Sequence, residues 1–535
     1  MSSLSLGTQL DNSSAPAFPS LPPSDVTKKQ SYGQILKSSA IVGGSTVLNV
    51  GIGIVRTKAM AILLGPGGFG LAGLYTSIIT LTQSFAGMGV NSSGVRQIAE
   101  AAGSGDEERI ARTAAVLRRT SIVLGVIGAA TLILFSRQVS AVTFGTAQRA
   151  GAICLLSMAI FCQLVAAGQG ALIQGMRRIA DLAKMNVLGA LSGAVISIPV
   201  VYFLREKGIV LSLVLVAAMT IITSWWYSRK IQINPPKLTT AQIGHETAGL
   251  LKLGVAFMAS GLMVPGVAYF VRVILLQKAG MAATGMYQSA WTLGGLYVGF
   301  ILQAMGADFY PRLSAVANDN AECNRLVNEQ ALIGLLLAGP GVIATLTFAP
   351  LVISLFYSAK FGGAVEVLRW VCLGATLQVV TWPMGFIILA KARQDFFFVS
   401  EFIWTIVAVG LAWACIASYG LNGAGIAFFL SYILHGVLVY PIVRHLSGFR
   451  WSFANRQTGL LFLSLIAVVF CGFYLMPLVW ASGVGILALV ASGAYSLRIF
   501  LHLLPFNRIP SPIRRSLALL RLAPSAHRRL PRLQA

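Results

Sequence analysis

The sequence predicts an all-α polytopic membrane protein with about fourteen transmembrane helices, arranged as two six-helix lobes and an additional C-terminal helix pair. The first observation behind this prediction is the composition. Of 535 residues, 56% are hydrophobic and only 10% are charged, against about 25% charged residues in an average soluble protein. Even large soluble domains leave much of their surface in water. The composition therefore excludes a soluble enzyme, a secreted disulfide scaffold and a disordered protein.

The second observation is a series of apolar runs of about 20 residues, which is the length that crosses a bilayer. The last two runs are separated only by residues 477–483. The expected spans are 38–64, 71–95, 114–135, 150–175, 184–204, 208–228, 250–277, 285–310, 329–357, 364–390, 396–418, 421–443, 458–478 and 481–504.

The third observation is the alternation of basic residues between successive connections. The chain has 40 Lys and Arg against 16 Asp and Glu, which gives a formal net charge of +24. If the N-terminus is cytoplasmic, the inside segments together with the cytoplasmic ends of the spans contain 29 of these cations, the outside loops 6 and the interior of the helices 5. Cytoplasmic loops of membrane proteins carry an excess of Lys and Arg. We therefore expect both termini in the cytoplasm, and we read the positive charge as topology and not as nucleic-acid binding.

These observations divide the chain into six parts. We expect a disordered cytoplasmic tail at 1–34, because residues 1–27 lack Lys and Arg and are rich in Ser and Pro. A first lobe at 35–228 and a second at 250–446 flank a cytoplasmic linker at 229–249, and the extra helices occupy 447–504. The Arg-rich tail at 505–535 is expected to lie on anionic lipids. A plain topology anchor explains that tail equally well.

An internal repeat supports the two lobes. Residues 62–81 align without gaps on residues 274–293, and nine of twenty positions are identical, among them Gly68/Gly280, Gly73/Gly285 and Tyr75/Tyr287. An even number of helices separates the copies, so both halves have the same orientation. A parallel repeat about an axis along the membrane normal is typical of transporters with a central site. A shared loop-and-helix composition is the alternative explanation.

Charged residues inside the spans are candidate substrate contacts, because each costs roughly 2.5–3.5 kcal/mol at mid-helix. Cations outnumber carboxylates at depth, which indicates an anionic cargo such as a phosphate or diphosphate. Snorkelling to the headgroups is the alternative for Lys58 and Arg272. Arg56 and Lys58 point about 200° apart, so a straight helix cannot aim both into one cavity. The candidate cations are Arg56, Lys58, Arg272 and Arg369, and the carboxylates are Asp308 and Glu401.

Polar and small residues form a stripe at helical spacing in the second and eighth spans. Their matching positions favour a cavity between the lobes, although such stripes also mark ordinary tight helix packing. The candidate substrate-binding residues among them are Gln83, Asn91, Gln288 and Gln303.

Other motifs do not indicate a cofactor or metal. Residues 65–70 match the dinucleotide fingerprint letter for letter, but they follow an apolar helix and not a strand. We expect a tight outside turn there. The sequence contains no Walker lysine motif, and its five His residues have no metal-ligand spacing.

Three segments together resemble Wzx-type polysaccharide flippases of the multidrug/oligosaccharidyl-lipid/polysaccharide (MOP) exporter superfamily. They are residues 58–71, 304–313 and 389–393, and the resemblance spans roughly 35–446. It implies a MATE-like fold and ion-coupled alternating access in the bacterial inner membrane. The cargo it implies is an undecaprenyl-diphosphate-linked oligosaccharide, moved to the outer leaflet for O-antigen or exopolysaccharide assembly. Lys58 and Arg272 match basic positions of that family, whereas Arg56 has no counterpart there. The fourteen-helix count also resembles the related lipid II flippases, which leaves the exact cargo open.

Coupling and competing functions complete the prediction. Asp308 and Glu401 are candidates for binding H⁺ or Na⁺, and pairing with Arg312 and Arg393 is the structural alternative. A drug exporter on the same fold is the main rival, but a site for organic cations should carry carboxylates at depth. A membrane-embedded glycan polymerase is disfavoured because every outside loop is short. We therefore expect a transporter and not an enzyme, with other polysaccharide-assembly membrane proteins as further partners.

Overall fold

The computed structural model describes residues 25–231 and 240–503, and every regular element within these ranges is helical. Eleven helical segments there are long and apolar enough to cross a membrane. Three of them, Gly43–Ala86, Ile179–Ser228 and Gly261–Gly299, each contain two of the expected spans or most of both. The all-helical membrane fold is therefore confirmed, although the count of eleven continuous segments differs from the expected fourteen spans.

The first half of the chain forms one bundle. Asp106 begins the third helix by accepting a hydrogen bond from the backbone N–H of Arg109 at 2.9 Å. The elements are α1 (Asp25–Ala86), α2 (Val90–Ser104), α3 (Glu107–Leu134), α4 (Ser136–Phe144), η1 (Ala147–Arg149), α5 (Ala150–Gly175), α6 (Ile179–Leu204), η2 (Arg205–Lys207) and α7 (Gly208–Ser228).

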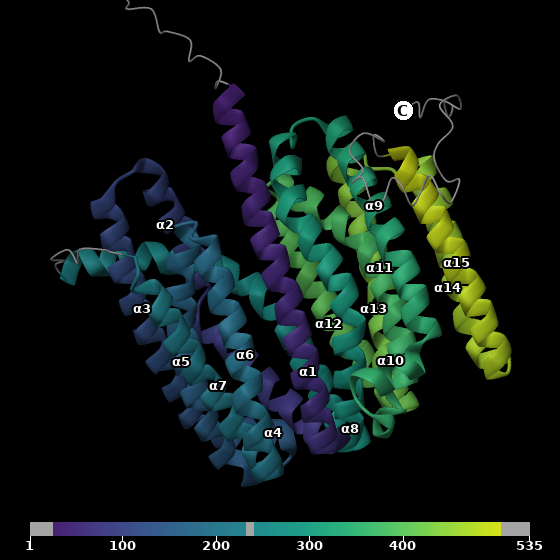
Figure 1. Cartoon of the computed structure of the whole chain (residues 1–535), viewed down its shortest axis with the longest axis horizontal. Coiled ribbons are helices and arrows are strands. Elements are labelled where there is room, and N and C mark those ends of the chain that lie inside the picture. The colour runs from purple at the N-terminus through teal and green to yellow at the C-terminus, as the bar shows by residue number, and fades with distance from the viewer. Residues whose placement is uncertain (1–24, 232–239, 504–535) are drawn as a thin grey trace, which may run out of the picture.

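The second half forms another bundle with a peripheral helix pair. Its elements are α8 (Thr240–Ala315), α9 (Asn320–Thr347), α10 (Ala349–Phe356), η3 (Ala359–Phe361), α11 (Ala364–Ala390), α12 (Gln394–Tyr419), α13 (Leu421–Ser447), α14 (Phe453–Leu475) and α15 (Leu478–Leu503). In Figure 1 α1 and α8 lie between the rest of the first bundle (α2–α7) and the rest of the second (α9–α13), and α14 and α15 lie at the edge of the second bundle.

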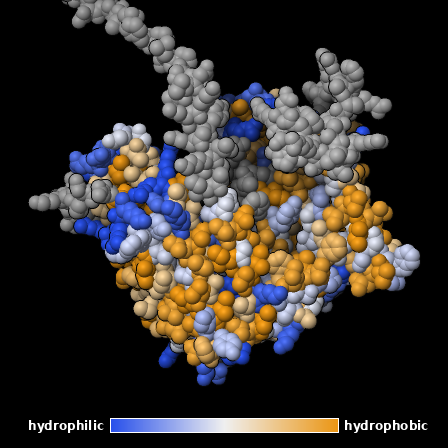
Figure 2. All heavy atoms as spheres, viewed as in Figure 1, coloured by the Kyte–Doolittle hydropathy of each residue, from blue (hydrophilic) through white to orange (hydrophobic). Residues whose placement is uncertain are grey.

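The molecule has two distinguishable ends. We call the end that carries α4 and α10 the bend end, and the opposite end, where α1 begins, the termini end (Figure 1). Between them an apolar band covers much of the visible surface, with hydrophilic residues gathered above and below it (Figure 2). This distribution is the one expected when the helices cross a bilayer.

The backbone confirms the parallel repeat. Both long helices bend at a glycine with positive φ, Gly65 (φ 62°) in α1 and Gly280 (φ 89°) in α8. The residues after α6 and α12, Arg205 and Gly420, share the same unusual conformation (φ 51° and 56°, both with ψ −132°) and are separated along the chain by the same interval as the two bends. The structure therefore matches Gly280 with Gly65, whereas the sequence alignment matches it with Gly68.

The two long helices touch each other at the bend end through equivalent residues. A Cβ atom built on Gly70 would lie 2.5 Å from the Met281 carbonyl oxygen, and one built on Gly285 would overlap the Pro66 carbonyl oxygen. In the structural correspondence Gly70 matches Gly285 and Pro66 matches Met281, so the contact is reciprocal. Such self-complementary contacts arise around a two-fold axis. Only glycine permits this backbone approach.

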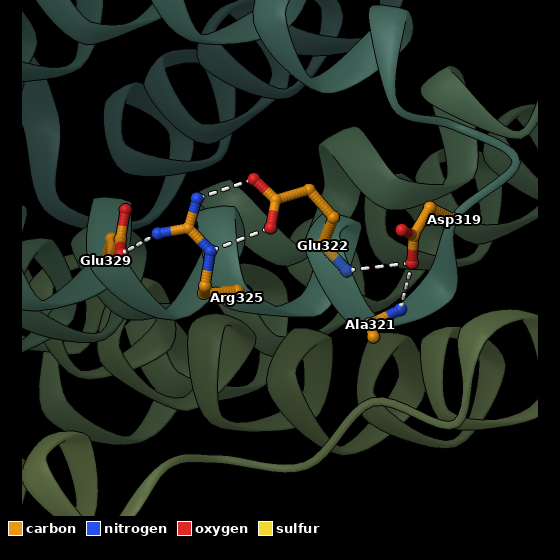
Figure 3. Close-up of polar contacts among 5 residues, drawn as sticks. All are labelled: Asp319, Ala321, Glu322, Arg325 and Glu329. Atoms are coloured by element: carbon orange, nitrogen blue, oxygen red, sulfur yellow. Dashed lines mark hydrogen bonds and ion pairs between the residues drawn. The ribbon is translucent and has the colours of Figure 1, made fainter. Parts of the chain in front are cut away.

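The N-terminus of α9 shows how the helices at the termini end begin. Asp319 accepts hydrogen bonds from the backbone N–H groups of Ala321 and Glu322, at 2.9 and 3.1 Å (Figure 3). One turn later the Arg325 guanidinium bonds the Glu322 carboxylate at 2.5 and 2.8 Å and also contacts Glu329. A capping carboxylate satisfies backbone donors that have no partner within the helix, so the start of α9 is fixed locally.

Two expected segment boundaries need correction. Helix α1 begins at Asp25, so residues 25–34 are helical where a disordered tail was expected. Helix α8 begins at Thr240, so residues 240–249 are also helical where a linker was expected. This part of α8 lies across the first bundle (Figure 1), where Thr247 and Thr120 of α3 share a hydroxyl contact at 3.3 Å. The tail predictions for 1–24 and for the basic residues after 503 lie outside the described residues.

Candidate functional site

A cavity of about 360 Å³ lies between α1, α7 and α8, and we call it the central cavity. Its volume falls within the roughly 300–1,000 Å³ of ordinary small-molecule sites. The segments before and after Gly65 in α1, and before and after Gly280 in α8, all contribute to its wall. The bends at these two glycines therefore place all four helical segments around one cavity. The lining residues with polar side chains are Arg56, Thr57, Thr76, Ser77, Thr80, Ser212, Arg272 and Gln288.

Arg272 enters the central cavity from α8 and is held by three neighbours. Its Nε donates to the Gln288 side-chain oxygen at 2.7 Å, and its NH1 donates to the Ala268 carbonyl at 2.5 Å. The Tyr287 ring lies 5.8 Å from the guanidinium carbon. The side chain is only 5% exposed, and its remaining terminal nitrogen, NH2, makes no hydrogen bond to another residue that the structure describes. The residue is thus a pre-oriented cation and not a side chain that reaches to the headgroups.

Arg56 enters the same cavity from α1. Its Nε donates to the Ser197 hydroxyl of α6 at 2.9 Å, and its NH1 lies beside Gly193, 3.6 Å from where a Cβ would stand. Arg56 precedes the bend at Gly65 by nine positions, and Arg272 precedes the bend at Gly280 by eight. The two arginines therefore occupy nearly equivalent places in the two halves of the repeat.

Two of the four candidate cations do not line the central cavity. Lys58 is not among the residues that line it. The reason is that Lys58 points in nearly the opposite direction from Arg56 on α1. Arg369 of α11 is 4% exposed, pairs with Glu366 at 2.7 Å and lies 3.9 Å from the Phe473 ring of α14. Its place is the contact between α11 and α14, away from the central cavity, and its role as a substrate contact stays a prediction.

The polar stripes of the sequence face three different spaces. Thr76, Thr80 and Gln288 line the central cavity, and Thr292 bonds Gln288. A second cavity of about 250 Å³ within the first bundle is lined by Gln83 and Asn91, among others. Part of the later stripe faces a third cavity of about 200 Å³ in the second bundle, lined by Gly295 and Gly299. Gln303 lies outside the side chains that the structure describes.

A carboxylate–imidazole pair in the second bundle was not predicted. His435 Nε2 of α13 lies 3.6 Å from the Glu401 carboxylate of α12, with side chains 11% and 22% exposed. Trp404 and Tyr432, which line the third cavity, contact the imidazole ring at centroid distances of 6.0 and 5.9 Å. His435 Nδ1 and Trp404 Nε1 are buried without a hydrogen-bond partner among the described residues. Sequence spacing gives no signal for this pair, because tertiary packing brings the two helices together.

The structural alternative for Glu401 is also corrected. Arg393 pairs with Asp395 at 2.8 Å and not with Glu401. This hydrogen-bonded pair holds the pKa of the Arg393 guanidinium above its usual value. The side chain of Asp308 lies outside the described part of the structure, so its pairing with Arg312 remains a prediction.

The charge of the central cavity limits what it can bind. Among the described residues that line it, two are arginines and none is a carboxylate. Guanidinium groups present fixed donors that match phosphate oxygens. An organic cation would meet repulsion there without a counter-charge. The cavity is therefore suited to an anion.

Comparison with known proteins places the chain in a family. Residues 59–366 match the family described as polysaccharide biosynthesis proteins, and the chain belongs to that family. It is 25% identical over 410 residues to the lipid III flippase of Escherichia coli K12, covering 75% of this chain and 96% of the relative. It is also 25% identical over 391 residues to a putative O-antigen transporter of Shigella flexneri, covering 70% of this chain and 90% of the relative.

Solved structures show the same fold. The lipid II flippase MurJ in an inward closed conformation has a TM-score of 0.64 at 14% identity, covering 87% of this chain and 99% of MurJ. An inward-facing MATE multidrug transporter of the MOP superfamily has a TM-score of 0.61 at 17% identity, covering 75% and 98%. The MATE-like fold is thereby confirmed, and the resemblance to polysaccharide flippases is confirmed by the matched family and the named relatives. The relatives are named as a flippase and a transporter, which confirms the expectation of a protein that is not an enzyme.

Proposed function

We propose that the protein is a flippase for undecaprenyl-diphosphate-linked oligosaccharide in the bacterial inner membrane. In this proposal both termini are cytoplasmic, the bend end faces outward, and the cargo moves from the inner to the outer leaflet. The observation that supports the proposal most directly is the central cavity, which places Arg56 and Arg272 from the two halves of the repeat around one space. The names of the relatives, lipid III flippase and putative O-antigen transporter, support the same class of cargo.

The two arginines would bind the diphosphate. Arg272 is fixed by Gln288 and Ala268, and Arg56 by Ser197, so each guanidinium is positioned before the anion arrives. Pre-oriented donors lose less conformational entropy on binding. A hydrogen bond to a charged group contributes about 1.5–3 kcal/mol, so losing one arginine should weaken binding by about tenfold or more.

A binding experiment with purified protein tests this assignment. We would measure the affinity of undecaprenyl diphosphate and of undecaprenyl monophosphate for the parent, Arg56→Ala and Arg272→Ala. Arg137→Ala removes the same charge from an exposed site at the bend end and is the matched control. The proposal expects both cavity variants to lose affinity for the diphosphate while the control keeps it. Parental affinity in both cavity variants would contradict the assignment.

We further propose that transport is coupled to H⁺ or Na⁺ through Glu401. Two observations support this proposal. Glu401 is partly buried, and a carboxylate at membrane depth is energetically costly and is normally kept for a function. It also has an imidazole neighbour, His435. A membrane potential supplies about 2.3 kcal/mol per charge per 100 mV. In this arrangement His435 and Glu401 would share the uptake and release of the ion.

Transport in vesicles with an imposed proton or sodium gradient tests the coupling. Glu401→Gln should still transport slowly, but the gradient should no longer accelerate it. Asp395→Asn removes a carboxylate that is paired with Arg393 on the same helix and should respond like the parent. Equal stimulation of Glu401→Gln and the parent would exclude Glu401 as the coupling residue and leave Asp308 as the candidate.

A further inference from the structure

Helix α1 carries its two cations on different sides. Arg56 lies in the central cavity. Lys58 follows Val55 by three positions and precedes Ile62 by four, so helical geometry puts these three side chains on one face. Val55 is 63% exposed and Ile62 is 56% exposed, and in a membrane that face contacts lipid. No hydrogen bond or ion pair joins Lys58 to another described residue in the structure.

An apolar groove begins next to Lys58. It has a volume of about 390 Å³ and runs between α1 and α6 toward the bend end. Tyr202 and Phe203 on its rim are 56% and 79% exposed. Among the described residues of its wall, the hydroxyl of Tyr202 is the sole polar side-chain group. The lining residues are Ala59, Ile62, Leu63, Ile198, Pro199, Tyr202 and Phe203.

The groove and the central cavity share one helix–helix contact. Arg56 lines the cavity and donates to Ser197, and the next residues of α6, Ile198 and Pro199, line the groove. On α1, Ala59 lies three positions after Arg56 and also lines the groove. The contact between α1 and α6 therefore has a cation on its cavity side and an apolar channel on its lipid side.

The second half of the repeat does not reproduce this groove. In the correspondence that matches Gly65 with Gly280, Leu63 matches Lys278 and Ile198 matches Trp413. The Lys278 ammonium lies 5.6 Å from the Trp413 ring, so a charged and a bulky aromatic side chain occupy the equivalent surface. Lys58 matches Val273, which is 5% exposed. The combination of a lipid-facing cation and an apolar groove is specific to the first half.

We propose that the α1/α6 groove holds the isoprenoid chain of the transported lipid diphosphate, with Lys58 contacting its phosphate. This inference rests on the proposed function. A polyprenyl diphosphate matches both features of the surface, an apolar chain for the groove and an anion for the cation at its inner end. With the phosphate at Lys58 and the chain running toward the bend end, the bound lipid has the orientation of an inner-leaflet lipid, whose chain extends outward from its phosphate. The groove therefore serves the lipid before its head group is turned outward.

Photo-crosslinking tests the occupant of the groove. A polyprenyl diphosphate with a diazirine in its chain is added to the full-length protein in nanodiscs, and the labelled residues are mapped by mass spectrometry. We expect labels on 59–63 and 198–203, competition by unlabelled polyprenyl diphosphate, and little competition by phosphatidylglycerol. Lys58→Ala should reduce the labelling and Lys58→Arg should restore it. Equal competition by phosphatidylglycerol would overturn the proposal and identify an ordinary annular lipid surface.

Matched tryptophan substitutions test the role of the groove in transport. Ile62→Trp fills the groove from an exposed position, and Val55→Trp places the same side chain on the same exposed face outside it. Ile62→Trp should slow flipping of a long-chain lipid-linked oligosaccharide by about tenfold, as expected when buried chain area is lost. It should spare a geranyl analogue, and Val55→Trp should behave like the parent.

The outcomes separate this inference from the proposed function. If the parent flips the long-chain substrate and Ile62→Trp flips it equally fast, the groove proposal fails while the proposed function stands. If the parent flips no lipid diphosphate, the proposed function fails, and the crosslinking then decides by itself whether the groove binds a polyprenyl chain. Ala59→Trp is a second groove-filling variant in case Ile62→Trp does not accumulate.

Discussion

The buried arginines show that one residue type serves two purposes in this protein. Arg272 and Arg56 line the central cavity, whereas Arg369 lies between Glu366 and the Phe473 ring. Sequence reasoning identified all three as costly at membrane depth. The sequence does not distinguish the arginines that line the cavity from the one that packs between helices, because that depends on which helix packs against each arginine. Lys58 illustrates the opposite case, since its direction on the helix already argued against a shared cavity with Arg56.

At the residue scale we predict that Arg369→Ala affects stability and not cargo recognition. The substitution leaves Glu366 without its cation and removes the contact with α14, a loss of about 1–3 kcal/mol. The melting temperature should fall, while the affinity for undecaprenyl diphosphate stays within about twofold of the parent. Arg272→Ala should show the reverse pattern. A large loss of diphosphate affinity in Arg369→Ala at matched protein levels would return Arg369 to the binding site.

At the scale of elements, the bends in α1 and α8 organise the site. The sequence predicted a tight turn at 65–70, and the structure places a bend with positive φ at Gly65. The sequence alignment paired Gly68 with Gly280 because it follows identical residues. The residues with equivalent backbone conformations are Gly65 and Gly280, three positions away from that alignment. The close approach of Gly70 and Gly285 was beyond sequence reasoning, which does not show which glycines meet across the two halves.

We predict that Gly285→Ala forces the two bundles apart at the bend end. A methyl group there would overlap the Pro66 carbonyl oxygen, and overpacking of this kind costs about 1–3 kcal/mol. Spin labels at the exposed residues Arg137 and Lys360, on either side of that end, report the separation. Electron–electron resonance should show a larger long-distance population in Gly285→Ala.

Gly266→Ala is the matched control for this prediction. It adds the same methyl group to α8 at a position where no atom lies within 4 Å of the new Cβ. Its distance distribution should equal that of the parent. If Gly285→Ala also shows the parental distribution, the contact between the two long helices does not hold this end closed.

At the scale of the whole molecule, α14 and α15 are attached to the second bundle away from the cavities described above. Phe462 of α14 packs against Gly339 of α9, and Asn455 bonds the Asn328 backbone and side chain at 2.8 Å. Among the described residues, neither helix lines any of those cavities. A peripheral place is what the sequence predicts for a helix pair that falls outside the internal repeat.

We therefore predict that a chain ending at Gln457 still inserts and transports. It keeps the Asn455–Asn328 contacts but loses the buried Phe462 and the contact of Arg369 with Phe473, so its thermal stability should decrease. Transport per inserted molecule, measured in vesicles, should remain within about threefold of the parent, a difference of less than about 1 kcal/mol. Normal insertion with complete loss of transport would show that the helix pair takes part in the transport cycle.

The central claim is that the cavity between the two halves carries a lipid diphosphate across the membrane. The most direct measurement is the transfer of a fluorescent undecaprenyl-diphosphate-linked oligosaccharide between leaflets of proteoliposomes, followed by quenching from outside. The account predicts transfer by the parent and by Arg137→Ala, and its loss in the Arg56→Ala/Arg272→Ala double variant at matched protein levels. It would be contradicted by a parent that transfers no cargo, or by a double variant that transfers it at the parental rate.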